Sequence, residues 1–130
     1  MIVDTSALVA IMADEPDAPR IATAIHHARG RIAVSAATLL EAAMVVESRG
    51  GEEAWRNLDA MLRHIGAEVV PLDRQQAEAA RRGWRRFGKG RHEAALNLGD
   101  CFAYALAMER DEPLLFKGDD FAQTDVKRAL

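Results

Sequence analysis

Short apolar runs alternate with longer helical patterns along the whole chain, and this alternation restricts the fold more than any other feature. Strands are predicted for Met1–Val3, Arg31–Ser35, Ala67–Pro71 and Pro113–Phe116, with a weak fifth near Asp125–Lys127. Helices are predicted for Ser6–Ala13, Asp17–Ala28, Ala37–Arg49, Glu52–Ile65, Arg74–Arg86 and Asp100–Arg110. Such alternation is typical of an α/β fold, in which helices cover a parallel sheet.

Length and composition indicate one globular domain over residues 1–130. The apolar fraction of 49% and the charged fraction of 28% argue against disorder. No apolar stretch approaches the roughly 20 residues that a membrane span needs. The single Cys101 allows no internal disulfide, so we expect a cytoplasmic protein. A net charge of −3 means that any signal for nucleic acid must be local.

Four acids stand in apolar or turn settings. Asp4 ends the first apolar run, at the sheet edge where ligands of open α/β folds bind. Glu41 lies in the apolar stretch Ala36–Val46, and Asp100 begins a helix. Asp119 follows the last strong apolar run. Each has an ordinary alternative: Asp4 and Asp100 as helix caps, Glu41 as a solvent-facing side chain, Asp119 as a turn residue.

Charge is the reason to group these acids. Several carboxylates held close together repel one another, and a divalent cation removes the conflict. Mg²⁺ or Mn²⁺ prefers oxygen ligands and activates water for attack on phosphodiesters. We therefore expect a metal-dependent phosphodiester hydrolase, most simply a small ribonuclease, whose products carry a 5′-phosphate and a 3′-hydroxyl.

A basic segment, Arg81–His92, contains no acid. Its cations can neutralise RNA phosphates, and Trp84 or Phe87 can stack on a base. The alternative is a solvated helix face with one core aromatic. Because the segment leads directly to Asp100, RNA contact is the preferred interpretation, with the candidates Arg85, Arg86, Lys89 and Arg91.

Several motifs together resemble the PIN-domain ribonucleases, specifically the VapC-type toxins of type II toxin–antitoxin systems. They are Val3–Leu8, Glu41 within Leu-Leu-Glu-Ala, Gly99-Asp100-Cys101 and Gly118-Asp119-Asp120-Phe121. The most specific stretch is Phe87–Cys101, which is similar to one VapC subgroup. That subgroup often has Pro where this chain has Glu93, a change that leaves every acid in place.

This resemblance implies a three-layer α/β/α sandwich and Mg²⁺- or Mn²⁺-dependent endonucleolytic cleavage of RNA. Position by position, Asp4 and Asp100 would be the main metal ligands. Glu41 would be a ligand or would orient metal-bound water, and Asp119 rather than Asp120 would complete the acidic cluster. Ser6 would hydrogen-bond a ligand or a coordinated water, with a helix cap as its ordinary alternative.

The resemblance also implies partners. They are a homodimer and a small VapB-like antitoxin, which lays a helix over an apolar groove and blocks the acidic pocket with a basic side chain. The predicted groove walls are Asp17–Ala28 and Glu52–Ile65, with Leu58 as a groove residue.

Other functions fit less well. A haloacid-dehalogenase-like phosphatase needs a second Asp two residues after the first, where this chain has Ser6. A dinucleotide-binding fold needs glycines that Asp4–Ala10 lacks. The remaining alternatives are a PIN-like protein-binding module without turnover, and a metal-dependent phosphatase or DNase. The presence of all four acids argues against a pure binding module.

Overall fold

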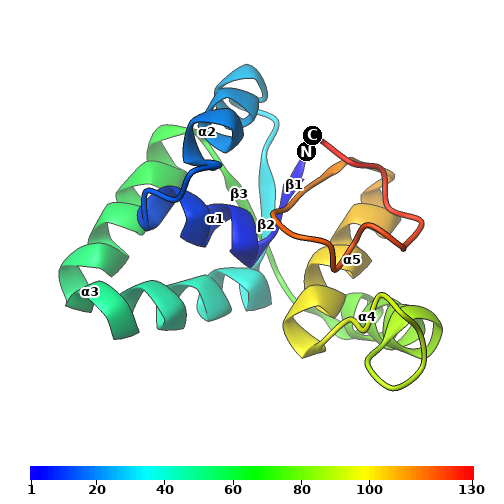
Figure 1. Ribbon diagram of the computed structural model, residues 1–130. Helices are drawn as coiled ribbons and strands as arrows, with labels where there is room; N and C mark the ends of the chain where they lie inside the picture. The colour runs from blue at the N-terminus through cyan, green and yellow to red at the C-terminus, as the bar shows by residue number, and fades with distance from the viewer.

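A four-stranded parallel sheet forms the centre of the computed structural model, which describes residues 1–130 (Figure 1). Its strands are β1 (Ile2–Val3), β2 (Ala33–Ser35), β3 (Glu68–Val70) and β4 (Leu114–Leu115), in the order β3-β2-β1-β4. Every pair is parallel, with Ile2 opposite both Ala33 and Leu114. The central position of β1 places the residue after it, Asp4, in the middle of the carboxyl edge.

The predicted helices are all present, with boundaries that differ by one or two residues. They are α1 (Thr5–Met12), α2 (Ala18–His27), α3 (Ala36–His64), α4 (Arg74–Phe87) and α5 (Leu98–Arg110). The two helices predicted on either side of Gly50-Gly51 form the two halves of α3, which kinks at Gly51 (φ 70°). The predicted fifth strand does not form; beside it, Arg128 makes an isolated bridge with Leu114.

Helices cover both faces of the sheet, which confirms the three-layer sandwich. In Figure 1, α1, α2 and α3 lie on one side of the sheet, and α4 and α5 lie on the other. Successive strand residues point to opposite faces. Val3 therefore packs with Leu8 and Leu58 in one core, while Ile2 packs with Leu106 in the other.

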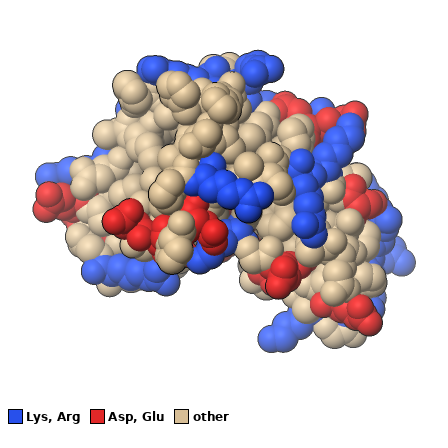
Figure 2. Space-filling model, turned by 45° about the horizontal axis from the view of Figure 1, so that its top comes forward, with Lys and Arg blue, Asp and Glu red and all other residues tan.

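Charged side chains of both signs are intermixed over the surface that Figure 2 shows, without a broad field of one sign. This distribution agrees with the small net charge of −3. None of the helices combines the length and the apolar character that crossing a bilayer requires.

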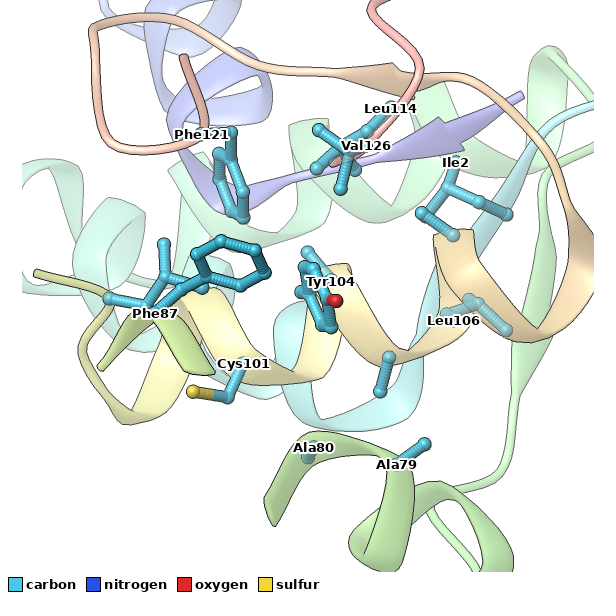
Figure 3. Close-up of a cluster of buried hydrophobic side chains, with 14 of the residues drawn as sticks. Ile2, Ala79, Ala80, Phe87, Cys101, Tyr104, Leu106, Leu114, Phe121 and Val126 are labelled. Carbon is cyan, nitrogen blue, oxygen red and sulfur yellow. The ribbon is translucent and has the colours of Figure 1, made fainter. Parts of the chain in front are cut away.

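The C-terminal segment completes the core that contains α5. Phe121 and Val126 point into the cluster that contains Phe87 and Tyr104 (Figure 3). The Phe121 ring also lies 5.1 Å from that of Phe116. Phe121 is almost fully buried, so the turn just before it is held against the carboxyl edge of the sheet.

Three helices begin at this edge, which is the lower end of the sheet in Figure 1. β1 leads directly into α1, β2 leads into α3, and the first turn of α5 packs beside them. The backbone therefore brings Asp4, Glu41 and Asp100 to one end of the molecule.

Candidate active site

Asp4 is the buried centre of the acidic edge, with only 4% of its surface exposed. It is the N-cap of α1: its Oδ2 accepts hydrogen bonds from the Ser6 N–H (2.9 Å) and the Ser6 hydroxyl (2.6 Å). Burial raises the pKa of Asp4, the hydrogen bonds from Ser6 and Thr5 oppose this rise, and the charge of Asp120 adds to it. Capping and a functional role therefore coexist in this side chain.

Glu41 projects from α3 toward the first turn of α5. A Cβ atom built on Gly99 would lie 1.8 Å from Glu41 Oε2, so only glycine allows the carboxylate to occupy this place. The side chain is partly buried. Burial raises the pKa of Glu41, as does the charge of Asp4, while a hydrogen bond from Thr5 lowers it. Gly99 thus provides a cradle for the carboxylate.

Asp100 lies in the first turn of α5 and forms a reciprocal capping box with Asn97. The Asn97 N–H donates to Asp100 Oδ2 (2.8 Å), and the Asp100 N–H donates to Asn97 Oδ1 (3.0 Å). Burial, together with the charges of Asp4, Asp120 and Glu41, raises the pKa of Asp100 to about 6, against the opposing hydrogen bond from Asn97. The capping box fixes the backbone from which this acid reaches the edge.

The fourth acid comes from the exposed turn after β4. Asp120, not Asp119, is the residue whose charge raises the pKa of both Asp4 and Asp100. The electrostatics therefore favour Asp120 for this position, and the sequence-based choice of Asp119 stays a prediction.

Ser6 ties two parts of the edge together. Its hydroxyl donates to Asp4 Oδ2 and accepts a hydrogen bond from the Lys117 N–H (3.0 Å). Ser6 is therefore not the cap of α1. It holds the Asp4 carboxylate and the segment after β4 in a fixed relation.

The acids fit a hydrated divalent cation better than a closed cage. No three carboxylate, imidazole or thiol side chains lie together as a ready-made metal centre. Mg²⁺ commonly uses one or two carboxylates and keeps several waters. The edge offers acids that raise one another's pKa, together with a cradle at Gly99 that holds one carboxylate against α5. These acids have no ion-pair partner in the chain.

The cations of the basic segment differ in their contacts: one is held in an ion pair and others are unpaired. Arg86 forms an ion pair with Asp125 (2.8 Å) and donates to the Tyr104 hydroxyl (3.4 Å), so it fastens the C-terminal segment to α4. Arg85, Lys89 and Arg91 are exposed and have no ion pair. Phe87 is buried against Tyr104, which excludes it as a base-stacking residue.

Two residues of the edge, Asn97 and Gly99, were not among the sequence-based candidates. The spacing of Asn97 and Asp100 is that of a capping box, which is visible in the sequence. The close approach of Glu41 to Gly99 is a tertiary contact and has no local pattern. The predicted antitoxin-groove residue Leu58 is fully buried in the core, so its assignment to a groove was wrong.

Comparisons with known proteins identify the family of the chain. The family model described as PIN domain matches residues 1–127. Ribonuclease VapC of Mycolicibacterium smegmatis is 52% identical over 97% of both chains. Ribonuclease VapC30 of Mycobacterium tuberculosis is 49% identical over 97% of this chain and 95% of the relative.

Solved structures resemble the fold at lower identity. Mycobacterium tuberculosis VapC20, described as a sarcin–ricin loop cleaving toxin, has a TM-score of 0.79 at 16% identity and covers 96% of this chain and 95% of its own. A toxin–antitoxin complex from Klebsiella pneumoniae has a TM-score of 0.71 at 18% identity and covers 99% of this chain and 97% of its own.

Proposed function

This chain belongs to the PIN-domain family of VapC ribonuclease toxins, and we propose that it hydrolyses RNA phosphodiester bonds with the aid of Mg²⁺. The observation that carries the metal dependence is the acidic edge. There, burial and then the charges of Asp4, Asp120 and Glu41 raise the pKa of Asp100, and no cation of the chain offsets these charges. A divalent ion would offset them.

In this proposal Asp4 and Asp100 hold the metal directly, with Asp120 or Asp119 completing the negative site. Bound Mg²⁺, for which Mn²⁺ can substitute, supplies positive charge that polarises the phosphate and acidifies water. Ser6 keeps the Asp4 carboxylate in one orientation through its bonds to Oδ2. Glu41 adds a ligand or accepts a hydrogen bond from the attacking water.

The test is cleavage of single-stranded RNA by the purified chain with Mg²⁺ or with EDTA. We expect cleavage only with Mg²⁺, and products with 5′-phosphate and 3′-hydroxyl ends. Asp4→Asn should lower the rate more than about a hundredfold, because loss of a ligand exceeds the usual effect of a change beside one. Asp59→Asn removes a carboxylate that pairs with Arg63 on the surface of α3, and it should keep the rate.

The other outcomes are equally informative. Products with 2′,3′-cyclic phosphate would contradict attack by water. Equal cleavage by Asp4→Asn and the unmodified chain would point to a contaminating nuclease. No cleavage with Mg²⁺ would leave the binding-module alternative, and cleavage of DNA of the same sequence or of a phosphate monoester would favour a DNase or phosphatase.

We assign the exposed cations of the basic segment to RNA phosphates. Arg85 and Lys89 suit a test because neither has an ion pair, whereas changing Arg86 would also release Asp125. Replacing both Arg85 and Lys89 with Gln should weaken RNA binding and lower the salt slope by about 0.7 for each phosphate that is no longer neutralised. An unchanged slope would remove the segment from the RNA-binding surface.

An antitoxin is the proposed protein partner, since a structural relative is named as a toxin–antitoxin complex. Its groove is assigned to the cavity of about 210 Å³ between α2 and the second half of α3, lined by Ile25 and Met61 among others. Met61→Glu should abolish inhibition by the cognate antitoxin without unfolding the chain. Undiminished inhibition would place the antitoxin elsewhere.

A homodimer is the proposed assembly. Leu40 and Met44 lie one turn apart on α3 and are 62% and 65% exposed, which leaves apolar surface free for a second copy. The double change Leu40→Lys and Met44→Lys should give a monomer in sedimentation experiments. An unchanged dimer, or a monomeric unmodified chain, would contradict this assembly.

A further inference from the structure

An apolar groove lies between α4 and the first turn of α5. It has a volume of about 620 Å³, within the range of small-ligand sites. Its walls include Trp84 from α4 and Leu98 and Phe102 from α5. Trp84 is 41% exposed and Leu98 is 74% exposed, so neither belongs to the core.

The indole of Trp84 is held in one place. A Cβ atom built on Gly88 would lie 2.4 Å from the indole Cδ1, so the ring rests directly on the glycine backbone. The guanidinium of Arg91 lies over the ring, 4.1 Å from its centroid. One face of the indole thus already receives a flat, cationic group, which is a geometry that a nucleobase can share.

The charges around the groove match a nucleic acid. Lys89 lines it, Arg91 covers Trp84, and neither has an ion pair. No acid occurs between Arg81 and His92. A base that replaces the guanidinium on the indole would free Arg91 to pair with the phosphate of the same nucleotide.

The groove is also joined to the acidic edge. Asn97 lines the groove and exchanges two hydrogen bonds with Asp100. A nucleotide held in the groove therefore sits next to the helix turn that carries an acid of the proposed metal site. From these contacts we infer that the groove is a nucleobase subsite, in which an unpaired base of the RNA stacks on Trp84 and sets which phosphodiester reaches the acids.

This inference rests on the proposed ribonuclease activity, and its test is binding rather than cleavage. The probe is a twelve-nucleotide single-stranded RNA of mixed sequence, added in EDTA to a Trp55→Phe background, in which Trp84 is the only tryptophan. We expect RNA to quench Trp84 fluorescence. An oligomer with the same ribose phosphates but no bases should quench it far less.

The matching variants are Trp84→Ala and Trp84→Phe. Loss of one base–aromatic stack should weaken RNA binding by roughly 5- to 100-fold in Trp84→Ala, and Trp84→Phe should recover most of it. Thermal unfolding of both variants shows whether the fold is kept, and Trp84→Phe provides the comparison if Trp84→Ala does not fold.

The two proposals fail differently. If the unmodified chain cleaves RNA with Mg²⁺ but Trp84→Ala binds the probe equally well, the subsite is overturned and the ribonuclease stands. RNA binding without quenching of Trp84 fluorescence overturns the subsite as well, and would favour an apolar segment of a protein partner as the occupant of the groove. If the unmodified chain neither binds nor cleaves RNA, the proposed function itself is overturned.

Discussion

The two edges of the sheet use acidic side chains in opposite ways. At the carboxyl edge, Asp4 raises the pKa of Glu41 and of Asp100, Glu41 raises that of Asp100, and none of the three has an ion-pair partner. At the amino edge, each acid has a partner: Glu68 accepts hydrogen bonds from Arg110 (2.7 and 2.8 Å), and Glu112 pairs with the amino group of Met1.

The pKa shifts follow this division. The hydrogen bonds from Arg110 lower the pKa of Glu68, so folding favours its charged form. Burial and neighbouring acids raise the pKa of Asp100 to about 6, so folding favours its uncharged form. Paired acids stabilise a fold, whereas acids that are held together unpaired cost stability and indicate a site for a positively charged ligand.

One helix contributes to both edges. The first turn of α5 carries Asp100 and its last turn carries Arg110. A helix has a positive N-terminal end and a negative C-terminal end, so each charge lies at the end that favours it. The contrast between the edges therefore comes from the partners of these residues and not from the helix.

Gly99→Ala is the substitution that we expect to disturb the acidic edge most without removing an acid. The added Cβ would overlap Glu41 Oε2 and force that carboxylate away. We expect RNA cleavage at saturating Mg²⁺ to fall by roughly 10- to 100-fold, as for other changes beside a metal ligand. Alanine favours helix formation, so the fold should persist. Unchanged cleavage would contradict the idea that Gly99 gives room for the Glu41 carboxylate. Adding Glu41→Gln to Gly99→Ala should lower the cleavage rate little further, because both changes remove the same carboxylate from the site.

A divalent cation should reverse the electrostatic cost of the acidic edge. At a Mg²⁺ concentration of 100 times the Kd, we expect stabilisation by about 2.7 kcal/mol, or roughly 10 °C in Tm. Thermal unfolding in EDTA, in Mg²⁺, and in NaCl of equal ionic strength measures it. Asp100→Asn should lose most of the shift. An equal shift in NaCl would mean that screening, rather than binding, is responsible.

The pH dependence of the metal-free chain distinguishes the edges by sign. The pKa of Asp100 lies at about 6 when folded and near 3.8 when unfolded, so the folded chain binds more protons between these values. Its contribution therefore lowers the free energy of unfolding as pH rises from 4 to 7. In EDTA at pH 7, Asp100→Asn should be more stable by about 1–3 kcal/mol, allowing for solvent screening. Urea unfolding at pH 5 and 7 measures this, and a less stable variant at pH 7 would contradict it.

The sequence could predict the elements because their cause is local. Apolar runs separated by breakers such as Gly50-Gly51 place every strand and helix to within a few residues. The strands are shorter than predicted because a residue counts as part of a strand only where its backbone hydrogen-bonds to an adjacent strand. The Arg31 carbonyl, for example, accepts a hydrogen bond from the Met1 amino group (2.7 Å) and lies before β2.

The sequence predicted that the site is a group of acids at the carboxyl edge of the sheet, but it did not identify every residue of the site. Asp4, Glu41 and Asp100 stand in settings that are unusual for acids, and the fold brings them to one edge. The choice between Asp119 and Asp120 depends on how burial of Phe121 orients the turn, which is a tertiary effect. Likewise, no local pattern shows that Arg86 pairs with Asp125 across 39 positions of sequence.

The smallest expected effect is at the amino edge, in Glu68→Gln. Glu68 and Arg110 side chains are 58% and 31% exposed, so their ion pair should contribute less than about 1 kcal/mol. Because the pKa of Glu68 is lowered, its contribution is present above the ordinary Glu range and is lost on acidification, the opposite sign to Asp100. At pH 7 without metal, Glu68→Gln should therefore be slightly less stable and Asp100→Asn more stable. In Mg²⁺, only Asp100→Asn should lose RNA cleavage. A tenfold loss of cleavage in Glu68→Gln would show that the two edges are coupled, because a paired surface acid far from the substrate has no other route to the reaction.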